Sequence, residues 1–330
     1  MTTLRVVVCG ATGFIGRNMA KHFASQPQKY QVTGISHRRS PFQHPGVAWR
    51  HADLTDQAQA DAAIADADIV IQAAATTSGA GDAFARPQIH IADNAVMNSH
   101  LLRAAFERKV KQFIFFSCSV MYPSSPKPVA EDDFDANRAI EPKYFGPAWT
   151  KLYIERMMEF YSRIGSTRFT IVRHSNIFGP YDKFDLERSH VFGATVTKVM
   201  TARNGRIVVW GEGTEARDVL HVSDLVSFVQ AAIDRQSAPC RIYNVGSGKA
   251  VAVRELVAAI VAASGRPLRI EHDLAKPTIK TSVSLDCSRA RAELEWRPRM
   301  SLDEGIRHTL DWYRGTYGEK GPDAPTGGAG

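Results

Sequence analysis

The stretch Gly10-Ala11-Thr12-Gly13-Phe14-Ile15-Gly16 decides the fold of this chain. It follows the hydrophobic run 4–9, which is typical of a buried strand, and it opens into a helical pattern from Arg17. Glycines at this spacing permit a tight turn, a close approach of the backbone to a pyrophosphate, and close packing of helix on strand. A plain turn is the alternative for a lone glycine pattern, but the strand and helix on either side favour a dinucleotide site. The predicted cofactor contacts here are Gly10, Thr12, Gly13, Phe14, Ile15 and Gly16.

Short hydrophobic runs alternate with helical patterns through the first half of the chain. This rhythm predicts an α/β fold, a doubly wound parallel sheet of the Rossmann type. The expected strands are 4–9, 31–36, 68–72, 112–117 and 168–174, and the two long helices are 93–108 and 148–163.

After residue 173 the rhythm changes to a loop-rich stretch, a helix from about Val191 and a short strand at 207–210. A helix at 222–234 and a strand at 241–245 could then return to the main sheet. We therefore predict that a smaller substrate lobe is interleaved with the dinucleotide-binding domain. The domain takes residues 1–173 and 218–245, the lobe takes 174–217 and 246–317, and 318–330 form a disordered tail without apolar periodicity.

Composition excludes several classes of protein. The 330 residues are 44% hydrophobic and 23% charged, and no stretch approaches the ~18 apolar residues of a membrane span. The N-terminal segment lacks a signal-peptide cleavage site, so we expect a cytoplasmic protein. The four cysteines are scattered, which predicts reduced thiols and no metal site. The net charge of +7 contains no long basic run, so an anionic small molecule fits better than nucleic acid.

The glycine spacing resembles the fingerprint of the extended short-chain dehydrogenase/reductase family, the NAD(P)-dependent epimerases and dehydratases. Further motifs of that family follow in order over residues 4–315. Asp53-Leu54 resembles its acidic pair at the adenine, Ala73-Ala74-Ala75 its small-residue turn, and 94–98 its helix that opens with asparagine. The resemblance implies a nicotinamide-dependent enzyme that acts on a nucleotide-activated sugar.

The choice of cofactor depends on the end of the second strand, which reads Ile35-Ser36-His37-Arg38-Arg39. An NAD enzyme usually has a carboxylate there for the ribose hydroxyls, and a carboxylate would repel a 2′-phosphate. Ser36, His37, Arg38 and Arg39 could instead bind that phosphate through charge-assisted hydrogen bonds. The segment predicts NADP, with a simple solvated loop and NAD as the alternatives.

The segment Ser117-Cys118-Ser119 precedes Tyr122-Pro123 and resembles the part of the family's active site that carries a catalytic hydroxyl. The usual serine or threonine position falls on Cys118, so Ser117, Cys118 and Ser119 all remain candidates. A structural role at a strand end is the alternative for all three. Lys151 matches the lysine of the family's Y-x-x-x-K motif, where it would contact the cofactor and tune proton transfer.

The tyrosine of that motif is absent, because position 147 is proline and the nearest upstream tyrosine is Tyr144. Proline favours the first turn of a helix, so Tyr144 could lie just ahead of the helix and still reach the nicotinamide pocket. We take Tyr144 as the candidate proton relay, with transfer of this role to Cys118 as the alternative.

Residues 173–180 and 210–225 resemble the family's diphosphate-binding segments. The sequence from Gly179 to Phe184, followed by His190-Val191, resembles the GDP-L-fucose synthase branch of the family, as does the loop around Lys276 and Lys280. In that branch the histidine is an acid for epimerisation, which makes His190 a candidate, with a solvated loop histidine as the alternative. The cysteine that assists it in that branch does not align with Cys118. The predicted substrate contacts are Arg173, Asn176, Lys183, Trp210, Arg217 and Lys276.

Together these motifs predict an NADP-dependent nucleotide-sugar epimerase or reductase acting at a 4-keto, or transiently oxidised, C4. The two long helices predict a homodimer, because they correspond to the interface helices of the family. The alternatives are a 4,6-dehydratase or decarboxylase with tightly held NAD, and a non-catalytic NADP-binding regulator favoured by the missing tyrosine.

Overall fold

A seven-stranded parallel sheet forms the centre of the protein, in the order β10-β6-β5-β4-β1-β2-β3. The computed structural model describes residues 3–76, 88, 91–186, 189–276, 278–318 and 321–322. The sheet contains β1 (Leu4–Cys9), β2 (Tyr30–Ser36), β3 (Val47–His51), β4 (Ile69–Gln72), β5 (Gln112–Phe116), β6 (Arg168–His174) and β10 (Cys240–Val245). The predicted doubly wound Rossmann fold is confirmed.

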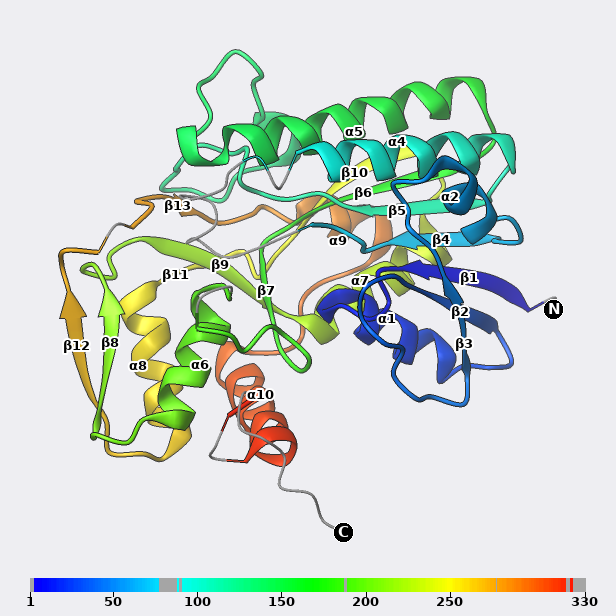
Figure 1. The fold of residues 1–330 in the computed structure, drawn as a ribbon. Helices are drawn as coiled ribbons and strands as arrows, with labels where there is room; N and C mark the ends of the chain where they lie inside the picture. The colour runs from blue at the N-terminus through cyan, green and yellow to red at the C-terminus, as the bar shows by residue number, and fades with distance from the viewer. Residues whose placement is uncertain are drawn as a thin grey trace, which may run out of the picture.

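Helices cover both faces of this sheet (Figure 1). Successive side chains of a strand point to opposite faces, so Val6 and Val8 of β1 belong to one core and Val7 and Cys9 to the other. The first core is closed by α1 (Phe14–Ala24), α7 (Val222–Arg235) and α9 (Ser288–Leu294). The second is closed by α2 (Gln57–Ala63), α4 (Ala92–Glu107) and α5 (Phe145–Ile164).

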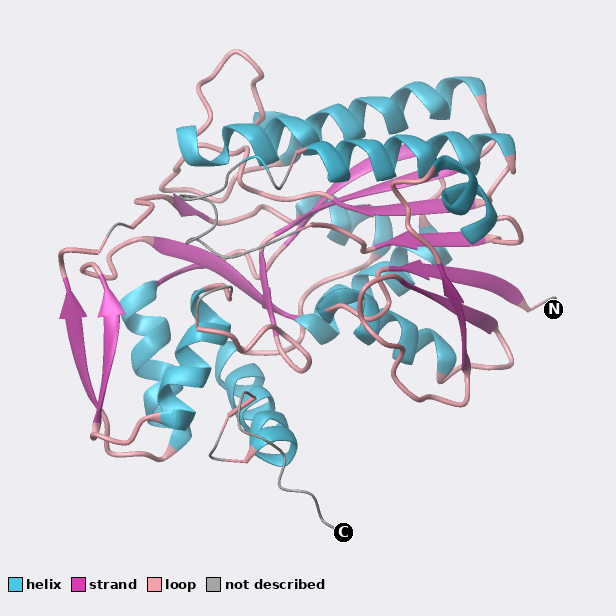
Figure 2. Ribbon diagram, in the orientation of Figure 1, coloured by secondary structure: helices cyan, strands magenta, loops and turns pink. Residues whose placement is uncertain are grey.

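A smaller lobe with its own core lies beside the main sheet (Figure 2). One of its sheets has the order β11-β9-β13, with β7 paired to β9, and the other pairs β12 with β8. Its strands are β7 (Asn176–Phe178), β8 (Arg206–Trp210), β9 (Ala216–His221), β11 (Ala250–Ala252), β12 (Arg269–Asp273) and β13 (Ser282–Val283). Its helices are α6 (Val191–Thr201), α8 (Val253–Ser264) and α10 (Leu302–Tyr317). β10 returns to the main sheet, and the exact division into domain and lobe stays a prediction.

Of the elements that differ from the sequence analysis, β3 and α5 bear most on the main sheet and the candidate site. β3 was not predicted, because at this sheet edge its residues are only partly buried and lack a clear apolar pattern. α5 begins at Phe145 rather than at Ala148, and it continues from the short 3-10 turn η3 (Pro142–Tyr144). Pro147 is accommodated in the first turn of α5, where its missing N–H breaks no helical hydrogen bond.

The described residues contain no helix long and apolar enough to cross a membrane. Most of the predicted disordered tail, and residues 77–87 beyond β4, lie outside the residues that the structure describes. The carboxyl ends of β1, β4, β5 and β6 meet at one edge of the main sheet, which is where ligands bind in open α/β sheets. The candidate site lies along this edge.

Candidate active site

The glycine loop after β1 has no room for a side chain at two of its positions. Gly10 has a φ of +70°, and a Cβ there would lie 2.7 Å from the backbone of Ala74. A Cβ on Gly16 would overlap the Gly10 carbonyl. Gly13 caps α1 without any side-chain hydrogen bond, and the first turn holds no acidic residue. The N–H groups of this helix end therefore suit a pyrophosphate, and the loop fits a dinucleotide.

The end of β2 presents basic side chains to solvent. Ser36 is buried, whereas His37, Arg38 and Arg39 are exposed. The nearby carboxylate of Asp53 accepts hydrogen bonds from the Thr55 N–H (2.9 Å) and hydroxyl (2.7 Å). These hydrogen bonds lower the pKa of Asp53, and the charges of His37 and Arg38 lower it further. This arrangement is compatible with a phosphate beside the ribose.

The turn after β4 is held close to the glycine loop. The Ala73 N–H donates to the Cys9 carbonyl (3.1 Å), and the Ala74 N–H donates to the Gln72 side chain (3.1 Å). Asn94, near the start of α4, exchanges two hydrogen bonds with the backbone of Thr76 (2.9 and 3.0 Å). The asparagine that opens this helix thus anchors the turn, and the predicted contact Leu54 is buried nearby in the same core as Ala74.

The three candidate hydroxyl and thiol groups after β5 have different surroundings. Ser117 is 1% exposed and donates to Glu155 of α5 (2.6 Å), so its hydroxyl is committed inside the protein. Cys118 and Ser119 are partly exposed. Burial raises the pKa of the Cys118 thiol, and the positive charge of Lys151 opposes that rise. Cys118 and Ser119 are therefore accessible to a ligand, whereas the Ser117 hydroxyl is buried and bonded to Glu155.

Lys151 lies beside the end of β5. Its ammonium donates to the Phe116 carbonyl (2.7 Å) and lies 4.5 Å from the centre of the Phe115 ring. Burial lowers the pKa of Lys151, whereas the neighbouring Cys118 and Glu155 raise it. The structure thus brings the predicted lysine next to the predicted thiol.

Tyr144 lies directly ahead of α5, as the sequence predicted. It packs, partly buried, against the same small cluster as Cys118. Burial raises the pKa of Tyr144, and the Arg217 guanidinium beside it is the largest influence in the opposite direction. The phenol is therefore flanked by a thiol and by an arginine that was predicted to bind a diphosphate.

Arg173 differs from its predicted role as a substrate contact. It is 1% exposed, and its guanidinium forms an ion pair with Glu155 (2.7 Å) and donates to the Tyr122 hydroxyl (2.9 Å). The adjacent Asn176 also uses its side chain within the protein, donating to the Asp218 carbonyl (3.1 Å). Arg173 is therefore not open to a ligand in this arrangement, whereas Asn176 stays partly exposed.

His174, at the end of β6, is a candidate that the sequence analysis missed. Its Nδ1 lies 2.7 Å from the Ser175 carbonyl oxygen, so Nδ1 carries the proton and Nε2 is an acceptor in the neutral ring. Burial lowers the pKa of His174 to about 4, and the charges of Lys151 and His190 contribute. His190, the N-cap of α6, therefore lies close to this part of the site. The sequence does carry a signal for this residue, namely a histidine at the end of a predicted strand inside the sheet, where ligands of open α/β sheets bind.

The remaining predicted substrate residues lie in the smaller lobe. Arg217 donates to the carbonyls of Ile279 (2.8 Å) and Thr281, which fixes the segment ahead of β13. The Lys276 ammonium lies 5.6 Å from the centre of the Trp210 ring, so these two predicted residues are neighbours. Lys183 contributes its N–H to the Asp182 carboxylate (2.7 Å).

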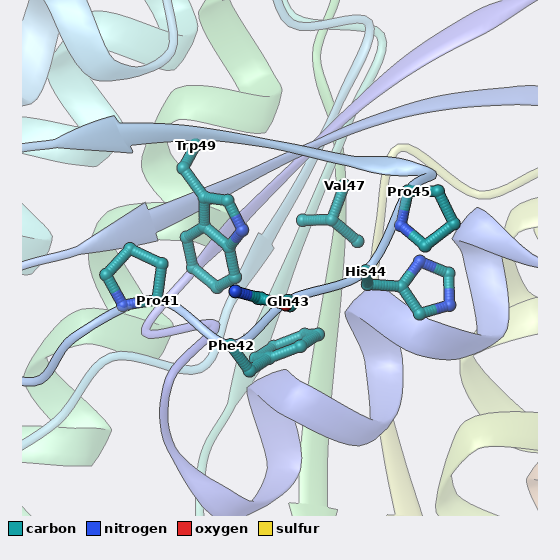
Figure 3. A pocket seen from close by; sticks show the side chains of 7 residues that line it. All are labelled: Pro41, Phe42, Gln43, His44, Pro45, Val47 and Trp49. Carbon is teal, nitrogen blue, oxygen red and sulfur yellow. The ribbon is translucent and has the colours of Figure 1, made fainter.

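A separate pocket lies between the end of β2 and β3 (Figure 3). It is lined by residues 41–45, Val47 and Trp49, and none of the predicted site residues line it. Among the described residues, no group of three potential ligands could hold a metal ion. The glycine loop, the Cys118 thiol, the Tyr144 phenol, the Lys151 ammonium and the His174 imidazole lie instead along the carboxyl edge of the main sheet.

These features define a nicotinamide-dependent enzyme class, and comparison with known proteins agrees. The chain belongs to the NAD dependent epimerase/dehydratase family, whose model matches residues 6–246. The predicted family and the prediction of an enzyme are confirmed, and members of this family bind a nicotinamide cofactor.

Particular relatives refine the picture. GDP-L-fucose synthase 1 of Arabidopsis thaliana is 31% identical over 317 residues, covering 94% of this chain and 93% of its own. A dTDP-4-dehydro-6-deoxy-D-allose reductase of a Streptomyces species is 27% identical over 319 residues, covering 94% and 96%. The chain is thus similar to enzymes that act on nucleotide-activated sugars.

A solved structure gives the same fold. The UDP-glucose 4-epimerase of Thermotoga maritima superposes with a TM-score of 0.84 at 21% identity, covering 95% of this chain and 99% of its own. At this identity the likeness concerns the fold alone.

Proposed function

We propose that this protein is an NADP-dependent epimerase or reductase of a nucleotide-diphosphate sugar, acting at a 4-keto or transiently oxidised C4. One observation carries the proposal: at the edge of the sheet that carries the glycine loop, Cys118 lies beside both Tyr144 and Lys151, and Arg217 lies beside Tyr144. The group proposed to transfer a proton and the group proposed to bind the diphosphate are therefore adjacent. The full-length similarity to GDP-L-fucose synthase and to a dTDP-keto-sugar reductase supports this substrate class.

In this proposal each residue has a separate task. NADPH, when bound, supplies the hydride for the keto carbon. Gly10 and Gly16 let the loop pack closely on its own backbone, the N–H groups that follow Gly13 would bind the pyrophosphate, and Ser36 to Arg39 would face the 2′-phosphate. The basic segment supports NADP over NAD because no carboxylate ends β2.

Tyr144 would exchange a proton with the sugar oxygen as the keto group is reduced. A phenol needs a nearby positive charge to do this near neutral pH, and the Arg217 guanidinium supplies one beside Tyr144. Lys151 would act on the adjacent Cys118 thiol. Cys118 or Ser119 would polarise the same oxygen. His190 would act as the acid for epimerisation, since an imidazole moves protons readily near neutral pH.

Substrate screening with purified protein tests the proposal. GDP-, dTDP- and UDP-linked hexoses, uronic acids and 4-keto sugars are each mixed with NADPH or NADH, and nicotinamide absorbance and the structure of the product are followed. Consumption of NADPH with a 4-keto sugar is expected. Redox-neutral loss of water or carbon dioxide with cofactor retained through purification would instead identify the dehydratase or decarboxylase alternative, and binding of NADPH without turnover of any sugar would favour a regulator.

We also propose a homodimer built on α4 and α5, which lie side by side in Figure 1. A stripe of large apolar side chains is exposed along α5, which is unusual for a free surface. It contains Phe145 (59% exposed), Tyr153 (53%), Phe160 (57%) and Ile164 (54%). Light scattering at micromolar concentration should give the mass of two chains, and a monomer would contradict the proposal. The cytoplasmic location likewise remains a prediction.

A further inference from the structure

A buried carboxylate connects three segments of the candidate site. Glu155 is 1% exposed and lies one helical turn beyond Lys151 on α5. Its Oε1 accepts a hydrogen bond from the Ser117 hydroxyl (2.6 Å) and one from Arg173 Nε (3.1 Å). Its Oε2 accepts from Arg173 Nη2 (2.7 Å). One side chain of α5 is therefore bonded to the ends of both β5 and β6.

Each partner of Glu155 is the immediate neighbour of a residue in the site. Cys118 follows Ser117, and His174 follows Arg173. Successive side chains along a strand point to opposite faces, so fixing Arg173 on the α5 side also fixes His174 on the other side of β6. These hydrogen bonds therefore join the helix that carries Lys151 to the segments that carry Cys118 and His174.

The same network continues to β10. Arg173 also donates to the Tyr122 hydroxyl (2.9 Å), which donates to the Asn244 side-chain oxygen (2.9 Å). The Asn244 N–H in turn donates to the Glu131 carboxylate (2.7 Å). All of these residues are buried, so their positions are set by bonding partners inside the protein.

A buried ion pair contributes little net stability, because desolvation of both charges offsets their attraction. Its directional hydrogen bonds do fix geometry, and proton transfer is sensitive to misplacement of about 1 Å. We propose that Glu155 is a positioning residue that holds the Lys151 ammonium in register with Cys118 and His174, acting through Ser117 and Arg173. This inference rests on the proposed function, since it concerns the same site.

Two variants separate positioning from stability. The double variant Glu155→Leu/Arg173→Met replaces the ion pair with apolar side chains, a change that often leaves stability intact. The double variant removes one negative and one positive charge. The loss of Glu155 lowers the pKa of the Cys118 thiol and the loss of Arg173 raises it, so the two direct effects oppose each other. Ser117→Ala breaks only the 2.6 Å hydrogen bond and changes no charge. Glu159→Gln, which alters an exposed ion pair with Arg156 on the same helix, is the matched control.

The first measurement needs no substrate. Iodoacetamide labelling of Cys118, followed by peptide mass spectrometry across pH, reports its thiol pKa. Because the Lys151 charge opposes the rise in the pKa of Cys118, displacement of Lys151 should move the midpoint of the profile upward. We expect the midpoint to rise by about one pH unit in the double variant, which is a tenfold decrease in the thiolate fraction near neutral pH. Ser117→Ala should show a smaller rise.

The second measurement is turnover of the nucleotide sugar identified by screening. We expect kcat to fall about 10²-fold in the double variant with little change in KM, and no change in Glu159→Gln. A folded double variant with the wild-type labelling profile overturns the inference, whatever the substrate. If it fails to fold, an unshifted profile in Ser117→Ala overturns it equally. Shifted profiles in an enzyme that turns over no nucleotide sugar would support positioning while refuting the proposed function.

Discussion

The two halves of the candidate site are built in different ways. The phosphate loop is a contiguous segment whose shape follows from backbone geometry, as the +70° φ of Gly10 and the closeness of Gly16 to its carbonyl require. The second half, proposed to transfer protons and called the proton-transfer half below, contains Cys118, Tyr144, Lys151 and His174 from three separate stretches of chain. The first half should therefore respond to steric change, and the second to the loss of single polar atoms.

The largest effect should come from the phenol in the proton-transfer half. Tyr144→Phe removes only the hydroxyl, so turnover should fall roughly 10²–10⁴-fold while substrate affinity hardly changes. Single-turnover hydride transfer, followed by nicotinamide absorbance, gives the comparison with Cys118→Ala. Full activity in Tyr144→Phe together with loss of activity in Cys118→Ala would mean that the proton relay has moved to the thiol.

A single methyl group should disable the phosphate-loop half. Gly16→Ala places a Cβ against the Gly10 carbonyl, and overpacking of roughly 3 kcal/mol corresponds to about 10²-fold in NADPH affinity. Gly315→Ala on α10 is the matched control, because a Cβ there meets nothing within 4 Å. Fluorescence titration measures both. Unchanged affinity in a folded Gly16→Ala protein would refute the loop as the pyrophosphate site.

Cofactor selectivity should depend on the exposed end of β2. Arg38→Ala should weaken NADPH binding about tenfold or more, because a charge-assisted hydrogen bond contributes roughly 1.5–3 kcal/mol. NADH affinity, titrated in parallel, should not change because NADH lacks the 2′-phosphate. Equal wild-type affinities for the two cofactors, unaltered by the substitution, would end the NADP assignment.

The smallest expected effect is a dependence of folding stability on pH, caused by His174 in the proton-transfer half. The pKa of His174 is lowered to about 4 from 6.5, chiefly by burial, so the unfolded chain binds its proton first as pH falls. The stability that the buried, neutral His174 contributes is fully present above pH 6.5 and is lost as pH falls toward 4.

Asp182 acts in the opposite direction, since burial raises its pKa to about 7 and makes stability fall as pH rises toward that value. The difference between wild type and His174→Gln in urea melts from pH 7 to 4 isolates the histidine. A difference that does not vary with pH over this range would contradict the lowered pKa of His174.

The sequence predicted much of the fold because its strongest signals are local. The runs that became β1 and β6 have the predicted bounds, and α6 begins at Val191 as expected. β3 escaped prediction, because an edge strand covered on one side needs less apolar sequence. Tyr144 was predicted to lie just ahead of α5 from the permissive position of Pro147, and the structure places it there.

The sequence by itself determined the glycine loop, the alternation of strands and helices that makes the Rossmann fold, and the basic segment after β2, because each depends on neighbours along the chain. Only the tertiary structure decided which polar side chains are available. Ser117 and Arg173 match catalytic and substrate motifs, yet both are bonded to Glu155 in the interior. His174 carries no motif, yet its place at the end of β6 brings it near Lys151. Burial and bonding partners come from distant segments, so residue type alone cannot distinguish a ligand contact from a support beneath it.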